Sequence, residues 1–386
     1  MIFTEARFFL LTVMCWVTFF AVPLRYRPHA LAFWGIVFYA IFAKGFLVLI
    51  GTLVIGTYLL CFSRPWAAIV LLAGVLFYFK LQGEAVTMAA LSITQIRPEK
   101  IMIPLGLSFL TFELIHFAIE RSRGRLSDVS LVDIIAFAFF VPCRIAGPIK
   151  RYPDFKAAVS QARMASENVY GGTVRILVGL FKKLVLADTL GLVVSDAVSS
   201  VSDPITAWTA VFAYSVQIYF DFSAYSDMAI GSAQLMGIRI PENFSYPYLA
   251  ENIQEFWRRW HISLSTWLRD YVFMGLGQRL FKTWLKACPV LIATICYIVT
   301  FFIAGAWHGL AANFLVWGLY HGVLLATYHL YRSWLPVTVA THQLYQSRAV
   351  SLTARGITFV LVSVGWVFFM ANLEEGTKLL HLMFRI

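Results

Sequence analysis

The sequence predicts an all-α protein that crosses a membrane many times. Of its 386 residues, 60% are hydrophobic and only 13% are charged, and the mean hydropathy is +0.75. About a quarter of the residues in a soluble globular domain are charged, so this composition excludes that class. Because a spanning helix needs about 20 apolar residues, the length allows roughly 9 to 12 spans. We expect them to form a single integral-membrane domain over residues 1–386.

The basic charge and the scattered cysteines point away from nucleic-acid binding and from a metal site. The formal net charge is +11, and an excess of Lys and Arg holds loops of membrane proteins on the cytoplasmic side. No basic soluble domain is present to bind a nucleic acid. The five cysteines lie apart in apolar runs without metal-ligand spacing, so we expect no bound metal. Because Glu5 dilutes the N-terminal charge and no small-x-small site precedes Pro23, we expect the first apolar segment to be retained.

Apolar runs divide the first 120 residues into predicted spans. The runs cover residues 8–24, 30–62, 66–81 and 101–119. A break at Lys44-Gly45 splits the second run into two spans, or into a span and a half-helix. Residues 82–100 are less apolar, which indicates a loop that can hold a surface helix. Glu113 and His116 lie three residues apart on one helical face, where they predict a polar seam between packed helices.

A short apolar run between two basic clusters predicts a re-entrant hairpin over residues 129–148. The run of about 15 residues is too short for a comfortable crossing, and Pro142, Gly147 and Pro148 interrupt it. Basic residues flank both sides, so both ends belong on the same side of the membrane. Irregular backbone at membrane depth is tolerated only where protein buries it or a cavity solvates it. We therefore expect a cavity nearby.

Two further predicted spans, residues 184–201 and 205–236, lead to the polar part of the chain. A carboxylate at the centre of a span costs at least ~2.5 kcal/mol, so Asp221 must be paired, near an end or facing water. Asp227 follows six residues later on a different helical face and needs a different partner. We expect both to be tied to the Arg-rich segment that follows. Gln217 lies one turn before Asp221.

Residues 252–271 concentrate three Trp, three Arg, a His, a Glu and an Asp in an otherwise apolar chain. Such a segment is too costly to leave in lipid. Its apolar residues recur at spacings of three and four while the arginines fall elsewhere on the wheel, which predicts one amphipathic interfacial helix. The apolar positions are Trp257, Trp260, Leu264, Trp267, Leu268 and Tyr271. The polar region 237–286, which from residue 251 holds six Lys or Arg against three acids, belongs on the cytoplasmic side.

Trp307-His308-Gly309 interrupts the C-terminal apolar runs. The predicted spans there cover residues 288–306, 310–331 and 357–371. No Gly-rich phosphate loop, paired cysteine ligands or G-x-S-x-G nucleophile motif is present. What remains for chemistry is His308 at this break and His261 in the interfacial helix, since a buried, neutral imidazole can serve as a general base. The alternative for each is a packing role among tryptophans.

Four motifs resemble the signatures of the membrane-bound O-acyltransferase (MBOAT) family. They are residues 217–231 (QIYFDFSAYSDMAIG), 241–248 (PENFSYPY), 255–270 (EFWRRWHISLSTWLRD) and 305–309 (GAWHG). Residues 104–112 and 146–152 are similar as well, so the resemblance spans roughly residues 100–330. It is specific to the bacterial branch that serves alginate and peptidoglycan O-acetylation and teichoic-acid D-alanylation.

The resemblance implies a helical bundle, with re-entrant and interfacial helices, around a central tunnel. It implies that His308 is the catalytic histidine and that His261 beside it orients or polarises a thioester. The implied supporting or tunnel-lining residues are Gln217, Asp221, Trp257, Arg258, Arg259, Asp270 and Trp307. Arg258, Arg259 and Arg269 are implied to meet the phosphates of CoA.

The implied donor is a cytoplasmic thioester, acetyl-CoA or an acyl carrier protein, with no metal or bound prosthetic group. The implied acceptor is an extracytoplasmic polysaccharide such as alginate, cellulose or peptidoglycan, reached with a periplasmic SGNH-type acetyltransferase partner. The chain would then be a multi-pass protein of the bacterial inner membrane, surrounded by lipids. Whether His308 is a general base or itself carries the acetyl group stays open.

Two other classes of function fit parts of the sequence. A transporter or flippase could use Glu113, Asp221 and Asp227 as a proton path, since buried carboxylates beside a broken helix are compatible with one. The chain could also be a non-catalytic scaffold of an envelope complex, but such a scaffold would need neither His261 nor His308. Turnover of labelled acetyl-CoA that depends on His308 separates the enzyme from both.

Overall fold

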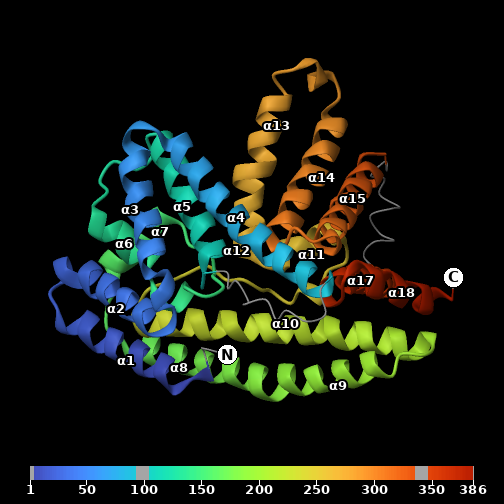
Figure 1. The fold of residues 1–386 in the computed structure, drawn as a ribbon, viewed down its shortest axis with the longest axis horizontal. Helices are drawn as coiled ribbons and strands as arrows, with labels where there is room; N and C mark the ends of the chain where they lie inside the picture. Colours follow the sequence, from blue (N-terminus) through green and yellow to red (C-terminus); the bar gives the residue numbers. More distant parts are fainter. Residues whose placement is uncertain (1–3, 93–103, 335–346, 386) are drawn as a thin grey trace. The chain divides into compact units, whose positions relative to one another are not determined.

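The computed structural model describes residues 4–92, 104–334 and 347–385, and every regular element in these ranges is helical (Figure 1). The all-α prediction is confirmed. The chain forms two compact units, Met1–Lys183 with Ser223–Glu242, and Leu184–Phe222 with Asn243–Ile386. That the whole chain acts as a single domain stays a prediction.

The first unit follows the predicted apolar runs closely. Its helices are α1 (Ala6–Ala21), α2 (Arg27–Phe42), α3 (Leu47–Ser63), α4 (Pro65–Ser92), α5 (Leu107–Ser122), α6 (Leu131–Ala138), α7 (Tyr152–Gln161) and α8 (Ser166–Phe181). The break predicted at Lys44-Gly45 is a 3₁₀ turn between α2 and α3. The loop with room for a surface helix that was predicted after residue 81 is wrong as far as Ser92, because α4 itself continues to that residue; residues 82–92 include three Ala, which favours helix. Residues 93–100 of that predicted loop lie outside the described residues.

The second unit holds the polar segment and the C-terminal helices. Its helices are α9 (Asp188–Ser199), α10 (Pro204–Leu235, whose last part belongs to the first unit), α11 (Ile253–Arg259), α12 (Ile262–Leu268), α13 (Met274–Leu280), α14 (Pro289–His308), α15 (Ala312–Trp334), α17 (Arg348–Met370) and α18 (Leu373–Phe384). A π-helical segment, Lys182–Ala187, leads from α8 into α9. The predicted span 184–201 therefore begins inside a longer helical run.

Within the described residues, four helical stretches are long and apolar enough to cross a membrane. They are Lys44–Ser63, Pro65–Gln82, Pro289–His308 and Arg348–Met370. Helix α1 is apolar but shorter, with 16 residues. The larger number of 9 to 12 spans stays a prediction.

The predicted hairpin contains a short helix followed by irregular, buried backbone. Helix α6 has eight residues, or about 12 Å of rise, which is too short to span a bilayer. The irregular part is held inside the first unit, because the Tyr225 hydroxyl donates to the Gly147 carbonyl (2.7 Å) and accepts from the Ala146 amide (2.8 Å). Protein thus buries this backbone, which is one of the two conditions that make it tolerable at membrane depth. The cavity expected nearby stays a prediction.

The polar seam predicted on α5 is confirmed. The Glu113 carboxylate pairs with the ammonium of Lys150 (2.7 Å) and the guanidinium of Arg144 (3.5 Å), and all three side chains are buried. The Nε2 atom of His116 accepts a hydrogen bond from the Tyr152 amide (3.0 Å). A carboxylate held between two buried cations fits a structural role in this seam.

Asp227 has different partners from those predicted. Its carboxylate pairs with Arg175 (3.1 Å) and Lys182 (2.6 Å) on the α8 side, and the expected link to the Arg-rich segment is wrong for this residue. The reason is a close helix crossing, in which Gly172 meets Gly231 so tightly that a Cβ on Gly172 would lie 2.7 Å from the Gly231 carbonyl oxygen. That crossing brings the basic side chains of the α8 side to the carboxylate.

Helices α14 and α15 form a hairpin in the second unit in which backbone lies directly on backbone (Figure 1). A Cβ at Gly318 would lie 2.3 Å from the Phe301 carbonyl oxygen, and one at Gly305 would lie 2.4 Å from the Phe314 carbonyl oxygen. Small residues permit this approach between membrane helices. The crossing fixes where α14 ends relative to α15.

We expect Gly318→Ala to destabilise the protein, because the added methyl group meets backbone that cannot turn away. Overpacking of this kind costs about 1–3 kcal/mol, which should appear as a lower Tm in detergent. Gly356→Ala in α17 is the matched control, since its methyl group would meet nothing within 4 Å and Ala favours helix. Equal Tm values for the two variants would contradict the packing argument.

Candidate functional site

His308 is the last residue of α14, as the predicted Trp-His-Gly break required. Gly309 leaves the helix in extended conformation, and its amide still donates to the Gly305 carbonyl (3.1 Å). The imidazole lies among aromatic rings, with centroid distances of 4.6 Å to Trp307, 4.8 Å to Phe369 and 5.2 Å to Trp317. It remains partly accessible. His308 thus has a largely apolar surrounding and is only partly buried.

The segment 252–271 is not one helix, and this prediction is wrong. It breaks at Trp260-His261 into α11 and α12, because His261 takes the left-handed conformation (φ 43°, ψ 52°). The side chains on the predicted apolar face are nevertheless buried at Trp257, Trp260, Leu264, Trp267 and Leu268. The spacing therefore identified the buried side but not the backbone path.

Asn243 holds this break in place. Its side-chain oxygen accepts from the hydroxyl of Ser263 (2.8 Å) and lies 3.1 Å from Nδ1 of His261. The backbone carbonyl of Asn243 accepts a hydrogen bond from the Ile262 amide (2.9 Å), and the Ser245 amide donates one to the backbone carbonyl of Arg259 (3.0 Å). These bonds replace the helical ones that the break removes.

His261 is 3% exposed and lies edge-on to Phe222, with the ring centroids 4.7 Å apart. Burial lowers the pKa of its imidazole to about 3, so the ring is neutral throughout the physiological range. Its neighbours differ from those of His308, which packs against Trp317 and Phe369. The two candidate histidines therefore occupy separate environments.

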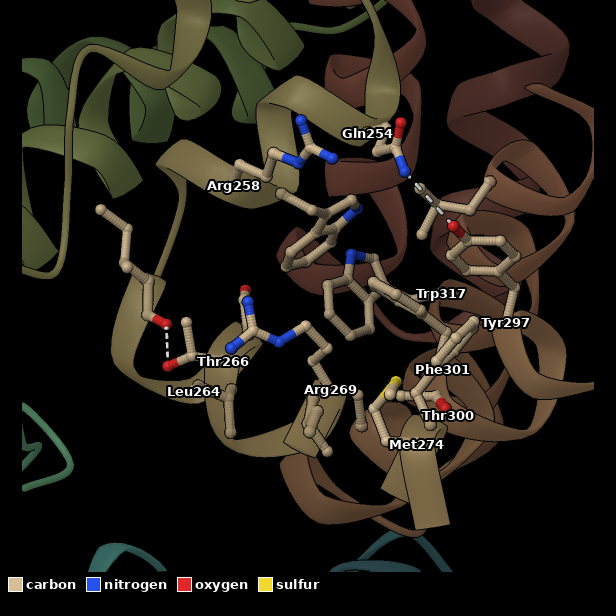
Figure 2. Close-up of a pocket in the computed structure, with 17 residues that line it drawn as sticks. Gln254, Arg258, Leu264, Thr266, Arg269, Met274, Tyr297, Thr300, Phe301 and Trp317 are labelled. Atoms are coloured by element: carbon tan, nitrogen blue, oxygen red, sulfur yellow. Dashed lines mark hydrogen bonds between the residues drawn. The ribbon is translucent and has the colours of Figure 1, made fainter. Parts of the chain in front are cut away.

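A cavity of about 510 Å³ lies in the second unit (Figure 2). Its walls come from α11, α12 and the π turn after it, α13, α14 and α15. The lining side chains are mostly apolar, with Trp257, Phe301, Ala304 and Trp317 among them. In Figure 2, Arg258 and Arg269 lie on one side of the cavity and Trp317, Phe301 and Tyr297 on the other.

One face of α14 runs along this cavity toward His308. Tyr297, Thr300, Phe301 and Ala304 line it, and His308 follows Ala304 at the next spacing of four. Residues at spacings of three and four share a helical face. The cavity wall on α14 thus ends at Ala304, four residues or about 6 Å of rise before His308.

The predicted polar residues divide between the cavity and other roles. Arg258 and Arg269 line the cavity, and Arg269 also pairs with Asp270 (2.8 Å). Arg259 instead pairs with Glu255, one turn earlier on α11. Gln217 and Asp221 lie on α10, where the Gln217 amide is 2.9 Å from the position of a Cβ on Gly191. Trp307 packs on His308.

Sequence reasoning did not single out two aromatic residues of α15 that lie beside the site. Trp317 contacts His308 and also lines the cavity. His321, one turn later, is fully buried, and its ring centroid lies 5.1 Å from that of Trp257 and 5.2 Å from that of Trp317. Their spacing of four was a usable signal, but in an apolar helix that spacing also describes ordinary packing.

The helical fold and this site place the chain among the membrane-bound O-acyltransferases. The model of the MBOAT family matches residues 8–364, so the chain belongs to that family, and the similarity extends beyond the predicted residues 100–330. It is an acyltransferase and a multi-pass membrane protein.

Its relatives act on several polymers, to judge by their names. The chain is 34% identical over 382 residues to the "Probable alginate O-acetylase AlgI" of Pseudomonas aeruginosa, covering 93% of this chain and 70% of the relative. It is 35% identical to the peptidoglycan O-acetyltransferase of Helicobacter pylori, and the match covers 72% of this chain and 56% of the relative. It is 32% identical to the teichoic acid D-alanyltransferase of Bacillus subtilis, covering 70% of each.

The buried His261 predicts a pH dependence of stability. Its pKa is about 3 in the folded chain and about 6.5 in an unfolded one. Between these values the unfolded state binds more protons, so stability falls as pH drops below about 6.5. We expect Tm to fall between pH 6.5 and 4.5 in the wild type, and to fall less in His261→Gln. Between pH 7.5 and 8.5 the two slopes should agree; equal slopes at acid pH as well would contradict the assignment.

Proposed function

We propose that the protein takes an acetyl group from a cytoplasmic thioester, acetyl-CoA or an acetylated carrier protein, and delivers it to hydroxyl groups of an extracytoplasmic polysaccharide. His308 is the residue proposed to act on the reacting groups. The observation that carries this is the face of α14, on which four cavity-lining residues lead to a partly accessible imidazole.

The proposed reaction is a transfer from sulfur to oxygen. His308 removes the proton of the acceptor hydroxyl as that oxygen bonds to the acyl carbon, and the carbonyl electron pair moves onto the carbonyl oxygen. The electron pair then returns to the carbon, the C–S bond breaks, and the thiolate leaves. The proton stays on the His308 imidazolium until it is released. In the second route an imidazole nitrogen first bonds to the acyl carbon, and the C–S bond breaks to release the thiolate. The hydroxyl oxygen then bonds to the acyl carbon, the C–N bond breaks, and the freed imidazole takes the hydroxyl proton.

The cavity suits the arm of a thioester donor. Phosphopantetheine is a flexible chain with a phosphate at one end and the thioester at the other. Arg258 and Arg269 are exposed and offer charge-assisted hydrogen bonds to phosphate, while the aromatic and aliphatic lining suits the chain. CoA and carrier proteins present the same arm, so both stay possible donors in the proposal.

The acceptor is proposed from the relatives. Their names refer to alginate, peptidoglycan and teichoic acid, so we propose an envelope or secreted polymer with free hydroxyl groups. We place this protein in the inner membrane, and such polymers lie outside that membrane. A periplasmic SGNH-type acetyltransferase is the proposed partner that completes the transfer.

Substituting His308 tests the proposal directly. Membranes carrying the wild type should release CoA from labelled acetyl-CoA when the acceptor is present, and His308→Ala should lower that rate at least about 100-fold, the lower range for a general base. His329→Ala on α15 is the control. Turnover by His308→Ala equal to that of the wild type would overturn the proposal. Labelled acetyl on His308 after rapid quench without acceptor would identify the covalent route.

The arginines at the cavity predict a preference for phosphate-bearing donors. Wild type should have a lower KM for acetyl-CoA than for acetyl-pantetheine, which lacks the phosphates. We expect Arg258→Gln and Arg269→Gln each to reduce this preference about threefold, because exposed charge pairs are worth up to about 1 kcal/mol. Arg259→Gln is the neighbouring control, since its guanidinium pairs with Glu255. An undiminished preference in both cavity variants would remove them from the donor site.

A further inference from the structure

Four buried side chains beside the cavity carry polar atoms that no described residue satisfies. They are Nε1 of Trp257, Nε1 of Trp317, both ring nitrogens of His321 and Oγ1 of Thr300. All four side chains are at least nine-tenths buried. A buried donor without a partner costs about 1–3 kcal/mol, and such groups are rare in native structures.

These atoms belong to one cluster. The ring centroids of Trp257 and Trp317 are 5.8 Å apart, and both rings lie against His321. Trp257, Trp317 and Thr300 also line the cavity. Trp317 also contacts the imidazole of His308. Trp317 therefore connects the cluster both to the cavity and to the residue proposed to carry the chemistry.

The chemistry of the cluster selects its ligand. Indole N–H groups only donate hydrogen bonds, and the neutral imidazole and the hydroxyl can each donate one as well. A ligand atom that satisfies several of them must be an acceptor, and a carbonyl oxygen that gains negative charge suits this best. The rings cover these atoms here, so binding requires the rings to turn slightly.

We infer that Trp257 and Trp317, supported by His321 and Thr300, bind the carbonyl oxygen of the thioester and stabilise its negative charge during transfer. The inference rests on the proposed function and assigns to these residues the polarising role expected of His261. When the nucleophile bonds to the acyl carbon, the electron pair that moves onto oxygen is held by the indole N–H groups until the C–S bond breaks.

Two uncleavable analogues of acetyl-CoA test the hydrogen bonds without requiring turnover. In the ketone analogue CH₂ replaces the thioester sulfur, and in the alkane analogue CH₂ also replaces the carbonyl. We expect wild type to bind the ketone about 10-fold more tightly, which corresponds to about 1.4 kcal/mol. Trp257→Phe and Trp317→Phe keep an aromatic ring but lose the N–H, and each should reduce this ratio about threefold to tenfold.

Trp366→Phe is the matched control. Trp366 stacks on Trp317, with ring centroids 6.1 Å apart and an interplanar angle of 21°. Its indole N–H, however, already donates a hydrogen bond to the Tyr248 hydroxyl (3.2 Å). Its variant should keep the wild-type ratio, even if its stability falls. A ratio near one in the wild type, as expected if these groups hold only water, would refute the inference, and so would an equal ratio in all variants.

Turnover separates this inference from the proposed function. Trp317→Phe should lower kcat about 100-fold, as the loss of one oxyanion donor does, with little change in KM. If His308→Ala abolishes turnover while both Trp→Phe variants keep it, the inference fails and the function stands. If the wild type does not turn over acetyl-CoA, the same series of variants is measured with an acetylated carrier protein, which shows which donor supplies the phosphopantetheine arm. If the wild type turns over neither donor, the proposed function is refuted.

Discussion

The contact of α14 with α15 through glycine is the constraint on which the site depends. Gly305 and Gly318 let the two backbones touch, and van der Waals contact of this kind is a main source of helix association in membranes. Trp317 directly precedes Gly318, and His308 lies one turn beyond Ala304. The same crossing therefore sets the Trp317 ring, which also lines the cavity, against the His308 imidazole.

The break at His261 provides the opposite wall. A straight helix would separate Trp257 from Leu268 by about 16 Å along one line. With the chain turned at Trp260-His261, α11 and α12 both line the same cavity. The strain of a non-glycine residue in left-handed conformation is about 1–3 kcal/mol, and the Asn243 hydrogen bonds offset it.

Local patterns predicted those elements whose cause is local. The turn at Lys44-Gly45 and the helix end at His308 follow from a polar residue beside glycine within apolar runs. The break at His261 was hidden, because the spacing of the apolar residues continues through it while its cause, Asn243, lies 18 residues earlier. Helix α18 was missed because Glu374, Glu375 and Lys378 lower its hydropathy, although Leu379 and Met383 pack in the core.

The candidate site shows the same limit, since burial is a property of several segments together. His308 and His261 are both candidates in the sequence, yet one is partly accessible at a helix end and the other is buried beside Phe222. A group that exchanges protons with substrate must be reachable, and a buried neutral imidazole bonded to Asn243 suits a positioning role better. The donors Trp257 and Trp317 come from α11 and α15, so only the folded chain brings them together. Hydrophobic periodicity recognises such tryptophans as packing residues, and only their lack of hydrogen-bond partners among the described residues distinguishes them from the rest of the core.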